Sequence, residues 1–199
     1  PMGTPVVFRE GCYALGDDRM TGKSMDDRSC FAILLETLSL LQKTELNVDV
    51  YVLGSCREET NSAGAMTAVY DIQPDLAVAV DVTFGKAPDV QSDDSFDLGG
   101  GPTIGIGPNM SHWMAEQLEE TAKKLEIPYQ LEIIPGNSGT NGWEIQVARE
   151  GIPTAVVSLP LNYMHTPLEV VSLTDMKRCA RLLAGFVAEL GEEGMECWI

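Results

Sequence analysis

The chain has 199 residues, of which 44% are hydrophobic and 22% are charged, so it is long enough for one globular domain with a sizeable core. Its formal net charge of -17 at pH 7 repels phosphate backbones and anionic headgroups, which excludes nucleic acid and membrane surfaces as expected partners. No apolar run is long enough to span a bilayer, and we find no signal peptide.

The first half of the chain predicts strands and helices in alternation. The expected elements, in chain order, are an extended segment over 5–15, a turn over 17–22, a helix with apolar residues at helical spacing over 30–42, a Val-rich strand over 48–56, a helix over 62–70 and an almost wholly apolar strand over 75–82. Strands as apolar as the last one are usually buried on both faces of a sheet.

The second half continues this alternation. The expected elements are a Gly-rich loop over 84–101, a short strand over 102–107, an amphipathic helix over 111–125 with Ser111 as N-cap, a strand over 129–134, a helix over 143–150 ended by Gly151, a strand over 154–159 and a closing amphipathic helix over 173–190. This order predicts a single α/β domain over residues 1–199, layered around a largely parallel central sheet. In such sheets ligands bind beyond the carboxyl ends of the strands.

Glu58 and Glu59 are the central candidates, because they follow the strand expected over 48–56. In isolation such a pair is more often a solvated loop, but its place after a strand favours a function. One carboxylate can bind a metal ion while its neighbour acts on water as a general base.

Asp26 and Asp27 precede Arg28, an arrangement that can simply be the acidic first turn of a helix. The functional interpretation is that Asp26 bridges two metal ions and Asp27 orients a neighbouring ligand. Arg28 would then neutralise and position Asp27.

Asp81 closes an apolar run, where burial of a carboxylate is costly unless it is paired or bound to metal. His165 follows the strand expected over 154–159; alone it would more often be an ordinary loop histidine. Together with Asp26 and Glu59, these residues supply the oxygen and nitrogen ligands that suit zinc or cobalt.

Cysteine usage predicts a reducing compartment. There is an odd number of widely spaced cysteines with no CxxC pair, namely Cys12, Cys30, Cys56, Cys179 and Cys197. Free thiols and a cytoplasmic location are therefore expected.

In this order, the motifs resemble the glutamyl and tetrahedral aminopeptidases, a family of cytoplasmic dinuclear metallopeptidases. The resemblance runs from about Val6 to about Val187. It is carried by TGKSMDDR at 21–28, EE at 58–59 followed by GA at 64–65, AVDVT at 79–83, SGT at 138–140, AREGIPT at 148–154 and YMHTPLE at 163–169.

The resemblance implies a three-layer α-β-α sandwich of the zinc-peptidase type, two divalent metal ions and removal of N-terminal residues from peptide substrates. Asp26 would bridge both metals, Asp81 would bind the first, and Glu59 and His165 would complete the second. Glu58 would be the general base that takes a proton from the bridging water. The peptide bond between the paired aspartates would be a candidate for the cis form.

Other positions are implied by the same resemblance. The Gly-rich stretch that ends in Gly139 and Thr140 would line the pocket, and Asn141 stands where the family commonly has Asp. That replacement bears on substrate recognition or on support of the ligands. Relatives also carry an N-terminal histidine that ligates the first metal, for which this sequence offers no counterpart.

We therefore expect the chain to be the C-terminal portion of a longer enzyme, without the first part of the catalytic domain and the inserted dimerisation domain. The second metal position should bind more tightly than the first, and the isolated chain should have little peptidase activity. The full-length parent is expected to be a homo-oligomer, from a dimer to a dodecamer.

Two other functions remain open. Some relatives are labelled endoglucanases, but a glycosidase needs two carboxylates about 5 to 10 Å apart across a sugar and no metal. A non-catalytic binding or assembly subunit is the other alternative. Asn141 and the missing histidine favour it, whereas the complete set of Asp26, Glu58, Glu59, Asp81 and His165 opposes it.

Overall fold

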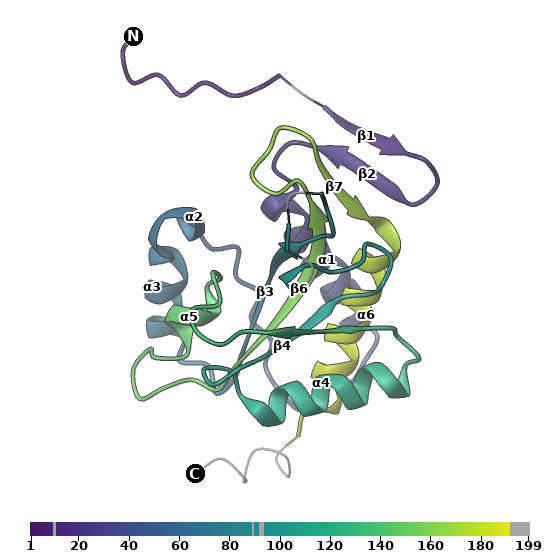
Figure 1. Ribbon diagram of the computed structural model, residues 1–199. Helices are drawn as coiled ribbons and strands as arrows, with labels where there is room; N and C mark the ends of the chain where they lie inside the picture. Colours follow the sequence, from purple (N-terminus) through teal and green to yellow (C-terminus); the bar gives the residue numbers. More distant parts are fainter. Residues whose placement is uncertain (10, 89, 92–93, 192–199) are drawn as a thin grey trace.

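A mixed sheet forms the centre of the protein, and helices lie on both of its faces (Figure 1). The computed structural model describes residues 1–9, 11–88, 90–91 and 94–191. In this part of the chain the strands are β1 (Cys12–Leu15), β2 (Arg19–Gly22), β3 (Ala77–Phe84), β4 (Thr103–Ile106), β5 (Gln130–Ile133), β6 (Thr154–Asn162) and β7 (Glu169–Ser172). The helices are α1 (Met25–Leu41), α2 (Glu58–Asn61), α3 (Ala63–Ile72), α4 (His112–Lys124), α5 (Gly142–Ile145) and α6 (Leu173–Glu189).

Strand β6 organises the sheet. It is buried over its first eight residues, and it pairs with β3 in parallel from Ala77↔Thr154 to Phe84↔Leu161. Its other edge pairs antiparallel with β4 at Val157 and Ser158, in the middle of the strand, and with β7 near its end. Beyond these lie β5, parallel to β4, and the hairpin of β1 and β2, which joins the sheet through β7.

Alternation along β6 separates two cores. Ala155, Val157, Leu159 and Leu161 belong to the large core that α1, α4 and α6 cover, whereas Val156 points to the opposite face. On that opposite face α3 packs on α5, and α5 contacts β3 and β6. Because successive side chains of a strand point to opposite faces, this pattern produces three layers, and the predicted α/β sandwich is confirmed.

Hydroxyl caps begin the two long amphipathic helices after the middle of the chain. Ser111 Oγ accepts the Met114 N–H at the start of α4, and Ser172 Oγ accepts the Asp175 N–H at 3.2 Å at the start of α6. Both oxygens satisfy backbone donors that have no partner within their helix. The predicted start of each helix is confirmed.

The strand predicted over 48–56 is wrong. In the described residues this stretch has no strand assignment, and Val50, Tyr51 and Leu53 are 36%, 68% and 37% exposed. A strand needs a neighbour to accept and donate its ladder hydrogen bonds, and this stretch pairs with none of the described strands. Its apolar composition therefore did not produce a buried strand.

Other differences follow from short connections. The turn predicted over 17–22 is wrong for Arg19–Gly22, which forms β2, and β7 was not predicted at all. Among the described strands, two pairings are parallel and four are antiparallel, so the expected parallel majority is wrong. The short loops from β1 to β2 and from β6 to β7 can join only antiparallel strands.

The helix predicted over 143–150 is also shorter than expected. It ends at Ile145, where the Ala148 N–H bonds to the Ile145 carbonyl in a turn, and the positive φ angles of Arg149 and Gly151 keep it from resuming before residue 151. A left-handed backbone cannot continue a right-handed helix.

Four of the cysteines are free thiols, with Cys30 and Cys179 buried and Cys12 and Cys56 exposed. This agrees with the prediction for these four, and Cys197 lies outside the described residues. In the same described part of the chain, none of the helices combines the length and the apolar character that crossing a membrane would require.

We predict that Gly101→Ala destabilises the fold, because a Cβ at this position would lie 1.7 Å from the Pro128 carbonyl oxygen and the residue has a φ of 92°. Overpacking and a strained backbone together should cost about 2–4 kcal/mol of unfolding free energy, measured by urea denaturation. Gly136→Ala is the control, since a Cβ there meets nothing within 4 Å. Equal midpoints for the two variants would contradict the prediction.

Candidate metal centre

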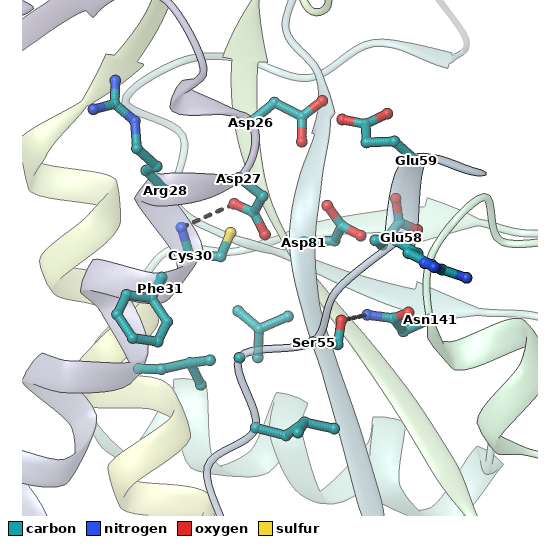
Figure 2. A pocket seen from close by; sticks show the side chains of 15 residues that line it. Asp26, Asp27, Arg28, Cys30, Phe31, Ser55, Glu58, Glu59, Asp81 and Asn141 are labelled. Carbon is teal, nitrogen blue, oxygen red and sulfur yellow. Dashed lines mark hydrogen bonds between the residues drawn. The ribbon is translucent and has the colours of Figure 1, made fainter. Parts of the chain in front are cut away.

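Three segments of the chain bring five acidic side chains close together (Figure 2). Asp26 and Asp27 come from the start of α1, Glu58 and Glu59 from the start of α2, and Asp81 from β3. We call these five residues the acidic centre. His165, from the loop after β6, lies against its outer side.

One group of donors combines two carboxylates with an imidazole. His165 Nε2 lies 3.1 Å from Asp26 Oδ2 and 3.4 Å from Glu59 Oε2, and one ligand atom from each residue falls within 4.8 Å of the others. The Asp26 side chain is only 9% exposed, whereas those of Glu59 and His165 are more than half exposed. The group is therefore open to solvent on one side, as a site that exchanges ligands must be.

A second group of donors shares a residue with the first. Asp26, Asp27 and Asp81 each offer a carboxylate oxygen, and these atoms also lie within 4.8 Å of one another. In Figure 2 the carboxylates of Asp27 and Asp81 point toward each other below Asp26. The donor types and the shared Asp26 fit divalent cations held side by side, so these residues could hold metal.

The electrostatics of the centre favour a cation strongly. Burial, followed by the charge of Glu59, raises the pKa of Asp26 to about 6, and burial raises the pKa of Asp27 to about 6. Burial and the charge of Asp27 raise the pKa of Asp81 to about 8. The pKa of Glu58 is also raised, first by burial and then by the charge of Glu59. Carboxylates this close disfavour one another's ionised form, and a positive charge would remove that cost.

The backbone at the start of α1 is irregular, and this directs the paired aspartates. Ser24 has a φ of 54°, the peptide bond between Asp26 and Asp27 is cis, and neither aspartate has helical angles. The candidate cis bond is confirmed. Asp26 therefore faces Glu59 and His165, while Asp27 turns toward the interior.

Arg28 does not neutralise Asp27, and that prediction is wrong. Its side chain turns away from the centre (Figure 2), and its Nε donates to the Ser24 carbonyl at 2.8 Å and a terminal nitrogen donates to the Lys23 carbonyl. Asp27 Oδ1 instead accepts the Cys30 N–H at 3.0 Å. This contact follows from the helical i to i+3 spacing, a signal that was present in the sequence.

Asp81 does not end its strand as predicted. It pairs with Ser158 within β3, which continues to Phe84 because Val82 and Thr83 still find partners on β6. The side chain of Asp81 shares the face of Ala79, where it lines a cavity with Glu58 and Asp26. Alternation along the strand, and not its end, therefore places this carboxylate.

The loop over 139–141 borders the centre. Gly139, Thr140, Glu58 and His165 line one cavity of about 410 Å³, and Asn141 lines the adjoining cavity of about 450 Å³. Asn141 donates from Nδ2 to Ser55 Oγ at 2.8 Å, which holds this loop to the stretch before α2 (Figure 2).

Two lining residues were missed by the sequence reasoning. Glu132 accepts hydrogen bonds from Thr83 Oγ1 at 2.7 Å and Thr103 Oγ1 at 2.6 Å, and it lines the cavity of 410 Å³ together with Glu144. No local motif marks either glutamate. The pairing of β4 with β5, and the placement of α5 against β3, bring them to the site.

Comparisons with known proteins agree on one family. A family model described as M42 glutamyl aminopeptidase matches residues 1–182. A lysyl aminopeptidase of Pyrococcus furiosus is 34% identical over 189 residues, which cover 95% of this chain and 54% of that protein. This chain thus spans about half the length of the curated relatives that it matches.

Solved structures point the same way. An aminopeptidase from the archaeon Desulfurococcus kamchatkensis has a TM-score of 0.85 at 35% identity, with coverage of 96% of this chain and 55% of the other. A TET aminopeptidase from a marine sediment Thaumarchaeota archaeon has a TM-score of 0.88 at 25% identity, with the same two coverages.

We predict that, in chelator, Asp81→Asn is more stable than the wild type at pH 8 but not at pH 4. The pKa of Asp81 is raised from 3.8 to about 8, so the folded protein holds a proton that the unfolded chain has lost. Wild-type stability therefore falls as pH rises between these two values, and Asn removes that loss. The gain at pH 8 should exceed about 1 kcal/mol in urea denaturation. A wild-type protein that is more stable than the variant at pH 8 would contradict this.

Proposed function

The chain belongs to the M42 glutamyl aminopeptidase family, and on this premise we propose that it supplies the metal-binding and catalytic carboxylates of a metal-dependent aminopeptidase. The observation that carries the proposal is the meeting of Asp26, Glu59 and His165 beside Glu58 and Asp81. Its substrates would be peptides with a free N-terminus.

In this proposal Asp26 belongs to two neighbouring cation positions. Glu59 and His165 complete one of them, and Asp81 contributes to the other, where Asp27 lies close enough to orient it or to share the cation. Bound divalent cations, zinc or cobalt, would polarise the scissile carbonyl and lower the pKa of the attacking water.

Glu58 is the proposed general base. It lies beside both donor groups, in the cavity that Asp81 and His165 also line. Its pKa is raised by burial and by Glu59, which brings its affinity for a proton closer to what catalysis near neutral pH requires. Glu58 would accept a proton from the attacking water and deliver it to the nitrogen of the leaving amine.

The substrate would be held by the same negative field. The free α-ammonium group of a peptide is attracted by the acidic centre, while a blocked N-terminus carries no charge to be attracted. Gly139, Thr140 and Asn141 border the space that the N-terminal residue would occupy. Because one solved relative is described as a TET aminopeptidase, we extend the proposal to a homo-oligomeric assembly.

Two alternatives fit less well. A glycoside hydrolase needs carboxylates on opposite sides of a sugar, whereas Asp26, Glu59 and His165 converge on one point. A non-catalytic subunit would need neither the convergent donors nor the cavity next to them. Hydrolysis that survives chelation would favour the glycosidase, and absence of metal binding would favour the subunit.

We predict that the 199-residue chain, dialysed against micromolar zinc, retains one tightly bound zinc per chain. Asp26→Ala should abolish this binding, because Asp26 is common to both donor groups. Asp97→Ala is the control, since Asp97 is exposed and pairs with Lys86 outside the acidic centre. Elemental analysis measures the stoichiometry, and zinc retained by Asp26→Ala would contradict the ligand assignment.

A further prediction concerns Glu58→Gln. This variant should keep its zinc but lose at least about 100-fold in the rate of release of N-terminal residues, as expected for removal of a general base. Mass spectrometry of products after long incubation measures even a slow rate, with N-acetylated peptide as the blank. Glu144→Gln makes the same change of charge in the same cavity and should have a much smaller effect. Equal rates in wild type and Glu58→Gln would remove Glu58 from the mechanism.

A further inference from the structure

Glu169, the first residue of β7, is a buried carboxylate that bonds to backbone on two sides. The residue as a whole is only 2% exposed. One oxygen, Oε2, accepts the Met25 N–H at 2.6 Å and the Asp26 N–H at 3.1 Å. The other, Oε1, accepts the His165 N–H at 2.9 Å.

Through Oε2, Glu169 caps the first turn of α1. The first N–H groups of a helix have no partner within it, and the residue before the helix usually supplies one. Here Ser24 is left-handed and makes no side-chain cap, and the irregular angles of Asp26 break the first turn. The carboxylate of Glu169 accepts two of these donors from a strand that lies 143 residues further along the chain.

Through Oε1, Glu169 restrains the loop that carries His165. This loop leaves β6 through two residues with positive φ, Tyr163 at 63° and His165 at 60°. A left-handed backbone is uncommon outside glycine and persists only where the surroundings hold it. The hydrogen bond from the His165 N–H to Oε1 supplies one such restraint.

The sheet sets where this double contact occurs. Glu169 pairs with Gly22 across β2 and β7, so the carboxylate stands next to the turn that leads into α1. Asp26 and His165, whose backbones it holds, are the pair whose side chains approach to 3.1 Å. Among the described residues no Lys, Arg or His side chain forms an ion pair with Glu169. Its charge is balanced chiefly by backbone N–H groups.

We propose that Glu169 is a positioning residue, whose two oxygens hold the segments of Asp26 and His165 at the separation that one cation requires. This inference rests on the proposed metal centre. An anionic carboxylate is needed because both oxygens must accept. A Gln amide offers one accepting oxygen and one NH₂ donor, so it would oppose either the Met25 and Asp26 donors or the His165 donor.

Glu169→Gln in the full chain tests the proposal with cobalt(II) as the probe. Loss of a group that orients metal ligands typically weakens metal binding about 10–100-fold, and we expect a loss of this size by calorimetric titration. The visible absorption bands of bound cobalt should also shift in position or intensity, because the angle between the Asp26 and His165 ligands changes. Unchanged affinity and unchanged bands would overturn the proposal.

Asp175→Asn is the matched control. Asp175 is also a fully buried carboxylate that accepts backbone N–H groups, from Gly99 and Gly101, and it lies at the start of α6, outside both donor groups. The Asp175→Asn variant should lower the midpoint of thermal unfolding, as Glu169→Gln does. Its cobalt affinity and its cobalt absorption bands should be the same as in the wild type. If Asp175→Asn lowers affinity equally, the effect is one of general stability and the positioning role is overturned.

Amide hydrogen exchange of the wild type gives a second test that does not depend on a variant folding. The amides of Met25, Asp26 and His165 should be protected together, and cobalt should raise the protection of all three. Rapid exchange of the His165 amide while Met25 is protected would overturn the double contact. If the wild-type protein binds no cobalt, the proposed metal centre is overturned as well. If the wild type binds cobalt and Glu169→Gln binds it with the same affinity and the same absorption bands, only the role of Glu169 is overturned.

Discussion

The burial of carboxylates that also repel one another is the constraint on which this structure depends. Asp26, Asp27 and Asp81 are largely buried and close together, and burial, with their mutual repulsion, raises the pKa of Asp26 and Asp27 to about 6 and that of Asp81 to about 8. A chain with a net charge of -17 would gain stability by separating them. Instead, the start of α1 and strand β3 bring these three carboxylates together, an arrangement whose electrostatic cost a bound cation would offset.

The fold meets this constraint with backbone groups and with few cationic side chains. Arg28 donates to two backbone carbonyls and forms no ion pair with Asp27. The Cys30 N–H donates to Asp27, and the Val82 N–H donates to Asp81. Glu169 adds a further buried negative charge but accepts three N–H groups in return. Neutral donors orient carboxylates without cancelling their charge, so the centre keeps its attraction for a metal ion.

The same end of the molecule carries apolar side chains that face solvent. Phe31 and Leu35 of α1, together with Tyr51 in the stretch before α2, are each about half exposed or more. The cavity of about 450 Å³ is lined by Phe31 and Leu53 as well as by the acidic centre, so it has apolar and charged walls. The acidic centre therefore has polar and apolar walls on different sides, an arrangement typical of small-molecule and peptide sites.

Local sequence determined the type of most elements and the identity of the candidate site residues. Helical periodicity located α4 and α6, with Ser111 as the predicted cap of α4, and the apolar runs located β3 and β6. The order of the candidate site residues indicated the family; these residues are Asp26, Glu58, Glu59, Asp81 and His165. Those signals are local, since each depends on residues a few positions apart. The pairing of strands is not local: β7 is too short to be recognised alone, and the apolar stretch over 48–56 found no partner. The separation of Asp26 and His165 and the hydrogen bonds of Glu169 depend on contacts between residues as many as 144 positions apart, so only the tertiary structure could decide them. Periodicity did not predict the side-chain direction of Arg28 either, because its backbone partners lie in the irregular start of α1.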